Sequence, residues 1–260
     1  ERSGVATICL EAVLLTSAWT AASVTYFSHS PFLGTAAALW VGAMTMSIHS
    51  FLVTKTKADP IVSGVAVNLL ALGVTPILTK LLFGSPTNTA ALPLSERMSS
   101  ELLLGLSFLL PFVLHFMVYK TGWGLRLLAA GDGPQALETS GVSPAKVRYG
   151  AMALGGAVVS LGGVYLSVAH ASQFTREMAA GRGFIALAAL IFGKWRPIPA
   201  FLTCLFFGLT DALQIHFQSS PLLGTTFPVQ ALQILPYLIT LFVLVGFIGR
   251  AKPPLAIGKS

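Results

Sequence analysis

The amino-acid sequence predicts an all-α fold, a transmembrane helical bundle with about eight crossings, one of them short or broken. Two observations lead to this prediction. Of the 260 residues, 54% are hydrophobic and only 10% are charged, whereas soluble domains carry about 25% charged residues. Mostly apolar stretches also recur at the length of about 20 residues that crosses a hydrocarbon core. We therefore expect a single transmembrane domain over residues 1–260 and no soluble domain.

The crossings follow one another with short connections between them. They are predicted at residues 5–28, 33–53, 61–83, 101–119, 149–170, 184–192, 199–217 and 229–249. The segment 184–192 is too short for a full helical span, and Gly181 and Gly183 stand just before it. We expect a half-helix here, extended or broken at these glycines. Non-helical backbone at membrane depth must then be buried in protein or line a cavity.

Basic residues divide unequally between the two sides of this bundle, and the net charge is +7. With a cytoplasmic N-terminus, 12 of the 16 Lys and Arg residues fall in inner connections, namely Arg2, Lys55, Lys57, Lys120, Arg126, Lys146, Arg148, Lys194, Arg196, Arg250, Lys252 and Lys259. The other four, Lys80, Arg97, Arg176 and Arg182, lie at or near the outer side. This is the positive-inside bias of membrane proteins, so the charge does not require a nucleic-acid partner.

Small residues in the segment 149–170 predict a close helix–helix contact. Gly155/Gly156 and Gly162/Gly163 stand seven residues apart, with Ser160 between them. This spacing places small side chains along one face of the helix, and such faces let two helix backbones approach closely in a membrane. We expect this face to press on a neighbouring helix.

The longest polar interruption is the loop of residues 120–148. Its run LRLLAA favours a short helix, GDGP ends it, and QALETSGV favours a second short helix that ends at Gly141. Asp132 or Gly133 caps the second helix, and Pro134 stands in its first turn, where the missing donor costs nothing. On spacing alone, an ordinary solvated connector explains the loop as well as a contact surface does.

Five residues at membrane depth or near the outer mouth are candidates for binding a solute. Ionisable groups in a membrane are costly and mark a pathway or an internal pair. Glu11 is predicted about two turns into the first helix, with a helix-cap or interhelical role as the alternative; Asp211 shares a helix face with Gln214. The Asn68 amide bonds either a solute or another helix. Phe174 suits stacking on a planar solute or anchoring at the interface.

Other classes of membrane protein lack the residues they need. No Ser/His, Asp/Asp or His/Glu set has the spacing of an active site, so we do not expect an enzyme. The five His and two Cys residues show no metal-ligand spacing, and we expect no metal site. A secondary transporter needs an ion or proton relay, for which only Glu11 and Asp211 are available. It stays the less favoured alternative.

Several ordered motifs resemble the ABC importer permeases of the simple-sugar, nucleoside and branched-chain amino-acid group. In the loop, the matching residues are Gly124, Arg126, Ala129, Gly131, Gln135 to Leu137, Gly141 and Val142. Further matches are ERSGV with Glu11, DPIVSGVAVNLLALG from Asp59, AAGRGFIALAALIFGKWRP from Ala179, and FGLTDALQ from Phe207. Together they span almost the whole chain and are most similar to the nucleoside-type branch.

The resemblance implies that the loop is a coupling helix that docks on a cytoplasmic ABC ATPase. The residues it assigns to this contact are Arg126, Ala129, Ala130, Gly131, Asp132, Gly133, Pro134, Gln135, Ala136, Glu138 and Gly141. The chain has no G-x-x-x-x-G-K-[ST] phosphate loop, so ATP and Mg²⁺ are expected to be used by the partner and no cofactor by this chain.

The resemblance also implies the other partners and the location. It predicts a second permease subunit, homologous or identical, an extracytoplasmic solute-binding protein, and lipid contact in the bacterial inner membrane. The outer connections 84–100 and 218–228 are expected to dock the binding protein. A nucleoside is the first solute class; a simple sugar, a ribityl compound such as riboflavin, and a branched-chain amino acid are the alternatives. A further hydrophobic segment is expected before Glu1.

Overall fold

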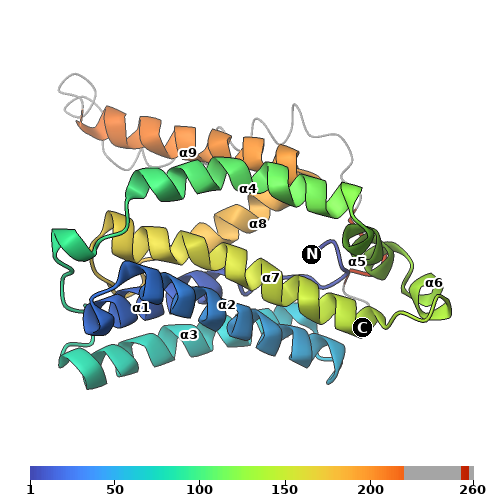
Figure 1. Ribbon diagram of the computed structural model, residues 1–260, viewed down its shortest axis with the longest axis horizontal. Coiled ribbons are helices and arrows are strands. Elements are labelled where there is room, and N and C mark those ends of the chain that lie inside the picture. The colour runs from blue at the N-terminus through green and yellow to red at the C-terminus, as the bar shows by residue number, and fades with distance from the viewer. Residues whose placement is uncertain (220–252, 258–260) are drawn as a thin grey trace. The chain divides into compact units, whose positions relative to one another are not determined.

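The structure is a computed structural model, and it describes residues 1–219 and 253–257 (Figure 1). This part of the chain is helical, with no strand and one isolated β-bridge between Asn88 and Thr175. Its elements in order are α1 Leu10–Ser28, α2 Pro31–Thr54, α3 Pro60–Phe83, the 3-10 helix η1 Leu94–Glu96, α4 Ser100–Lys120, α5 Gly122–Asp132, α6 Pro134–Thr139, α7 Pro144–Val164, the π-helix η2 Tyr165–His170, α8 Arg182–Phe192 and α9 Pro197–Ser219.

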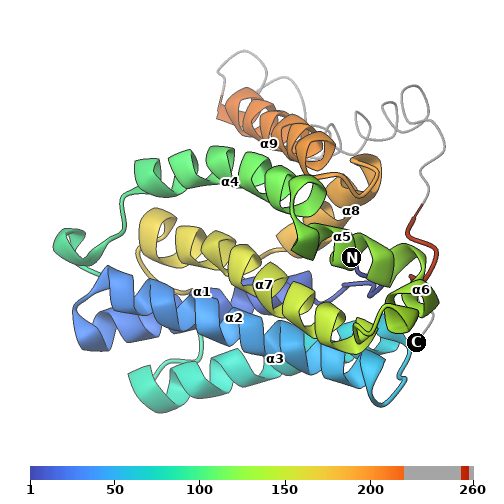
Figure 2. The same cartoon turned by 45° about the vertical axis from the view of Figure 1, so that its right-hand side comes forward.

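The chain divides into two compact units. Residues 1–187 and 254–260 form the first, and residues 188–253 form the second. The first unit holds the helices from α1 to η2 and the start of α8. Within it, α1 contacts α2, α3, α7 and η2. Figure 2 shows α3 on one side of the α1–α2 pair and α7 on the other. α1 is therefore enclosed by other helices of this unit.

Five helical stretches of the described residues are long and apolar enough to cross a membrane. They are Pro31–Thr54, Pro60–Phe83, Leu94–Lys120, Pro144–His170 and Pro197–His216. The all-α membrane fold is therefore confirmed, but the count of about eight crossings is not. α8 is only 11 residues long, about 16 Å at 1.5 Å per residue, and the predicted crossing at 229–249 lies outside the described residues.

The central position of α1 in the first unit explains its polar composition. Eleven of its 19 residues are buried. The hydroxyls of Thr16, Ser17 and Thr20 bond carbonyls of their own helix, with Ser17 Oγ 2.6 Å from Val13 O and Thr16 Oγ1 2.8 Å from Ala12 O. A helix that faces protein on most sides can carry such hydroxyl groups, because their hydrogen bonds are satisfied without water.

The prediction that the first helix begins at residue 5 is wrong. α1 begins at Leu10, and Ser3, Gly4, Val5, Thr7 and Cys9 are buried without being helical. The Ala12 amide in the first turn of α1 bonds Asn68, which is the ninth residue of α3 and so about 12 Å along that helix. α1 therefore starts part-way through the bundle, and a non-helical segment leads to it.

The predicted close contact of α7 is confirmed. A Cβ on Gly156 would overlap the carbonyl oxygen of Gly42 in α2, and one on Gly163 would overlap Ser17 of α1. Ser160 packs in the same interface, against Gly42. Gly155 has open space around it, so only part of the predicted glycine set makes the contact.

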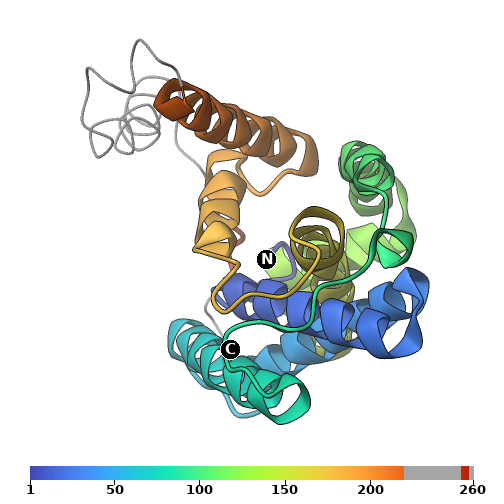
Figure 3. The same cartoon turned by 90° about the vertical axis from the view of Figure 1, so that its left-hand side faces the viewer.

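The predicted short segment after α7 is a half-helix reached through irregular backbone. Figure 3 shows the chain returning from the end of η2 to the start of α8. Ser172, Glu177 and Ala180 have φ between 47° and 60° in this return, a conformation that costs non-glycine residues energy and needs support from their surroundings. Part of that support is the backbone pairing of Leu92 N with Ser172 O at 2.8 Å.

Candidate functional site

Glu11 joins the beginnings of two helices. It lies in the first turn of α1, not two turns in as the sequence suggested. Its Oε1 accepts a hydrogen bond from Gly181 N and its Oε2 one from Gly183 N, both at 2.8 Å. The carboxylate therefore caps α8, and it lies at the positive ends of both helix dipoles, which stabilises a negative charge. In this geometry Glu11 makes the helix-cap contact that the sequence offered as its alternative.

Asn68 of α3 hydrogen-bonds to the backbone at the start of α1. The side chain is 6% exposed. Its Oδ1 accepts a hydrogen bond from Ala12 N at 2.9 Å, and its Nδ2 donates to Ile8 O at 3.1 Å. The described amide thus bonds the backbone on either side of the point where α1 begins, which is the interhelical alternative, and its contact with a solute stays a prediction.

His49 of α2 supports the same segment and was missed by the sequence analysis. It is fully buried. The Ala6 carbonyl can only accept, so Nε2 donates to it at 2.9 Å. In the neutral ring Nδ1 then accepts from the Ser63 hydroxyl at 3.0 Å. A histidine in the middle of an apolar span was the only available signal, and its partner became visible only once the N-terminal segment proved to be non-helical.

The other three candidate solute residues are Phe174 in the first unit and Asp211 and Gln214 in the second. Phe174 is fully buried in the main hydrophobic cluster, and its amide donates to Thr89 Oγ1 at 2.9 Å. Its ring therefore packs inside the protein in this conformation. Asp211 and Gln214 lie on α9 in the second unit, three residues apart on one helix and hence on one face. Their role toward a solute stays a prediction.

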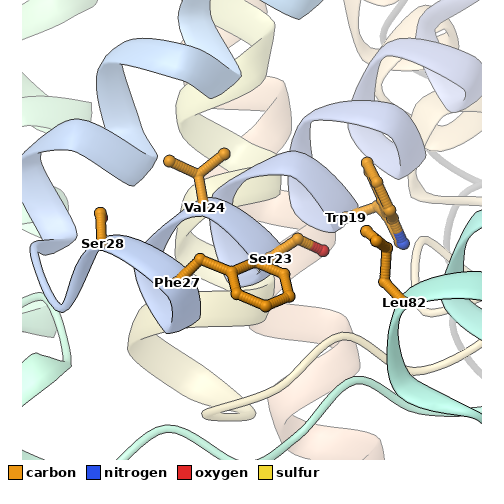
Figure 4. A pocket seen from close by; sticks show the side chains of 6 residues that line it. All are labelled: Trp19, Ser23, Val24, Phe27, Ser28 and Leu82. Atoms are coloured by element: carbon orange, nitrogen blue, oxygen red, sulfur yellow. The ribbon is translucent and has the colours of Figure 1, made fainter.

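An apolar groove of about 290 Å³ lies between α1 and the end of α3. Figure 4 shows its lining side chains, Trp19, Ser23, Val24, Phe27, Ser28 and Leu82. The Ser23 hydroxyl is buried here without a protein partner. The candidates of the same unit, Glu11, Asn68 and Phe174, do not line this groove.

The polar loop contains the two short helices that the sequence predicts. Thr121 Oγ1 caps α5 by accepting from Gly124 N at 3.2 Å, and Pro134 occupies the first turn of α6. Gly133 rather than Asp132 is the N-cap of α6. Gly141 follows α6 with a φ of +83°, a conformation in which any side chain would be strained.

The loop residues assigned to an ATPase contact fall into two groups. Those exposed to solvent are Arg126, Asp132, Gln135, Ala136, Glu138 and Gly141, and those partly exposed are Ala129, Gly133 and Pro134. Ala130 and Gly131 are buried and cannot offer a surface to another protein. The loop therefore presents mainly α6 and the ends of α5.

The buried side of α5 packs on the N-terminal segment, which the sequence did not predict. A Cβ on Gly131 would overlap the carbonyl oxygen of Arg2. Arg148 at the start of α7 donates from Nε to Ser3 O at 3.2 Å. Ala256 N donates to Gly131 O at 2.8 Å, so residues from near both ends of the chain contact this helix.

Comparison with protein families decides what kind of protein this architecture belongs to. Residues 1–244 match the family described as the permease component of the branched-chain amino acid transport system. The chain belongs to this permease family. The permease is accordingly an integral membrane transport subunit and not an enzyme, as the sequence motifs implied.

Three similar proteins match nearly the whole chain. The guanosine ABC transporter permease protein NupQ of Bacillus subtilis is 36% identical over 99% of this chain and 88% of its own length. The nucleoside ABC transporter permease protein NupC of Lactococcus lactis is 29% identical with the same coverage. A putative glucose ABC transporter permease, TsgC13 of Haloferax volcanii, is 30% identical over 94% of this chain and 83% of its own length. No solved structure matches the permease.

Proposed function

We propose that this permease carries nucleosides into the cell as the membrane-spanning subunit of an ABC importer. The observation that carries the proposal is the 36% identity to a guanosine permease over 99% of the chain. Sequence similarity this extensive includes the loop and the α1–α8 junction, and a second nucleoside permease matches over the same share of the chain. Both relatives are named as permeases of ABC transporters.

In the proposed complex, ATP and Mg²⁺ are used by a separate cytoplasmic ATPase, and this chain uses no cofactor. The loop of α5 and α6 is its docking element. A short helix held at both ends suits this task, because it can move as a rigid piece. Thr121 and Pro134 start the two helices, and Gly141 ends the second. The exposed face of α6 supplies the contact, with Gln135, Ala136 and Glu138.

The remaining partners follow from the same proposal. The connection between α3 and α4 docks an extracytoplasmic binding protein; most of the second predicted docking connection, 218–228, lies outside the described residues. A second permease, homologous or identical, completes the translocation pathway. Lipid covers apolar side chains such as Trp40, Leu81 and Phe116, which are 65%, 74% and 62% exposed. The complex resides in the bacterial inner membrane.

Transport by the reconstituted importer tests the solute class. The full-length permease, its ATPase and its binding protein are placed in liposomes, and ATP-dependent uptake of labelled guanosine, glucose and leucine is compared. Guanosine uptake, blocked by excess of another nucleoside and not by glucose, is the expected result. Uptake of glucose alone would instead support a sugar permease, the class named for the 30% identical TsgC13. Failure of any ATPase to associate would overturn the whole proposal.

A bulky residue on α6 should separate the permease from its ATPase. Ala136 is exposed, so Ala136→Trp leaves the fold intact but obstructs a partner at this surface. We expect co-purification of the ATPase to fall by about tenfold or more. The matched control is Ala91→Trp, also at an exposed alanine but in the outer connection. Equal ATPase recovery for both variants would remove α6 from the interface.

A further inference from the structure

Residues 2–11 contact both the loop helix α5 and the start of α8. They connect the proposed ATPase-docking element at the inner end of the bundle with a junction that lies part-way along α3. We propose that this segment, which we call the N-terminal strut, carries displacements of α5 to the start of α8. The proposal rests on the proposed docking role of the loop of α5 and α6, and it names the residues that connect this loop with the membrane interior.

At the inner end the contact is backbone against backbone. A Cβ on Gly131 would overlap Arg2 O and would lie 3.3 Å from Gly4 N. Gly4 has a φ of +91°, and a Cβ there would be 3.4 Å from Ala130 O. At Gly131 the three nearest atoms all belong to the backbone of Arg2 and Gly4, whereas at Gly4 the nearest atom is Arg148 Nη2 at 3.3 Å. A tightly packed interface of this kind transmits a shift instead of absorbing it.

Along its length the strut is held against sideways movement. Ala6 O accepts from His49 on α2, and Ile8 O accepts from Asn68 on α3. Thr7 N donates to the Glu1 carboxylate at 2.9 Å. Cys9 is fully buried, with its Sγ 3.5 Å from Met46 Sδ. These contacts tie the non-helical strut to α2 and α3, and we infer that a shift of its inner end is passed along the backbone to residue 11.

At the far end the strut continues into α1, and the Glu11 carboxylate accepts hydrogen bonds from the start of α8. Its two carboxylate oxygens bond the Gly181 and Gly183 amides at 2.8 Å each. A Cβ on Gly183 would lie 2.8 Å from Glu11 Oε2 and would overlap the Glu11 backbone. The return segment before α8 is irregular and strained at Glu177 and Ala180. We therefore expect small shifts of Glu11 to move the first residues of α8.

A double-mutant cycle tests whether the two ends act through one connection. Gly131→Ala disturbs the inner contact and Glu11→Gln the outer one, and uptake per ATP hydrolysed is measured for each in the complete reconstituted importer. Each single change is expected to lower this ratio by about tenfold. The ratio of the double variant is expected to be no lower than that of the worse single variant, because both changes interrupt the same connection and their effects do not add. Losses that multiply would overturn the proposal.

Matched controls separate this effect from general damage. Gly150→Ala adds the same methyl group to α7 where nothing lies within 4 Å, and Glu101→Gln changes an exposed glutamate in the first turn of α4. Both are expected to keep the uptake-to-hydrolysis ratio. If either control falls as far as Gly131→Ala or Glu11→Gln, the ratio reports damage and the proposal is withdrawn.

The reaction rate of the Cys9 thiol distinguishes a strut that moves during ATP hydrolysis from one that only holds α1 in place. With every other cysteine replaced, the buried thiol is expected to react with N-ethylmaleimide about tenfold faster during ATP turnover than without nucleotide, and Gly131→Ala is expected to abolish this difference. An unchanged rate on adding ATP would overturn the strut, even if Gly131→Ala fails to fold. Because this rate needs no particular solute, a wrong nucleoside assignment leaves the test intact.

Discussion

Gly156→Val is expected to prevent stable folding of the permease. The valine Cβ would overlap the Gly42 carbonyl oxygen and lie 2.7 Å from Met46 Cβ, so α2 and α7 must separate along their shared face. Overpacking of a well-packed core costs about 1–3 kcal/mol and occasionally more, and here one colliding group is backbone that cannot change rotamer. The yield of monodisperse protein in detergent should fall severalfold, and the thermal midpoint of what remains should drop.

Gly155→Val is the control for this prediction, since it adds the same side chain one residue earlier on the same helix. Gly155 has nothing within 4 Å of its added Cβ. We expect wild-type yield and midpoint. If the two valine variants behave alike, α2 and α7 do not meet backbone to backbone at Gly42 and Gly156.

Asn68→Leu should have the second-largest effect. The change leaves Ala12 N and Ile8 O without the partners they have at 2.9 Å and 3.1 Å. Each buried group left unpaired costs about 1–3 kcal/mol, so unfolding should become easier by about 2–6 kcal/mol in total. Denaturation of the detergent-solubilised permease measures this, and Cys9, beside the same junction, should become reactive to maleimide in the absence of ATP.

Thr75→Val provides the comparison in the same helix. Thr75 is 2% exposed, and its hydroxyl only donates to Ala71 O within α3 at 2.8 Å. Valine has nearly the same shape, so we expect a cost below about 1 kcal/mol. A similar loss of stability in the two variants would show that Asn68 contributes through packing and not through its bonds to residues 8 and 12.

The loop of α5 and α6 was predictable because its signals are local. A proline in a first helical turn and a glycine after a helix act through backbone conformation, which neighbouring residues determine. The two faces of the loop were not predictable. Ala130 and Ala136 have the same side chain, yet one is buried against the N-terminal segment and the other is exposed. Only the path of a distant part of the chain distinguishes them.

The prediction of a first helix from residue 5 failed for the same physical reason. The run from Val5 to Cys9 is as apolar as a helix start, but His49 and Asn68, more than 40 residues away, bond the carbonyls of residues 6 and 8 in a non-helical backbone. Glu11 was recognised as significant because a carboxylate is costly inside a membrane. Its partners could not be predicted, since they are the backbone N–H groups of Gly181 and Gly183, and every non-proline residue has such a group.

By itself the sequence determined that this is an all-α membrane permease, and it located the polar loop, the half-helix and the glycine face of α7. These features depend on hydropathy, charge bias and local backbone preference, all of which are properties of short stretches. Only the tertiary structure decided where α1 begins, what Glu11 and Asn68 bond, and which loop residues face inward. These depend on hydrogen bonds and close contacts between segments far apart in the chain, where the identity of a residue does not reveal its partner.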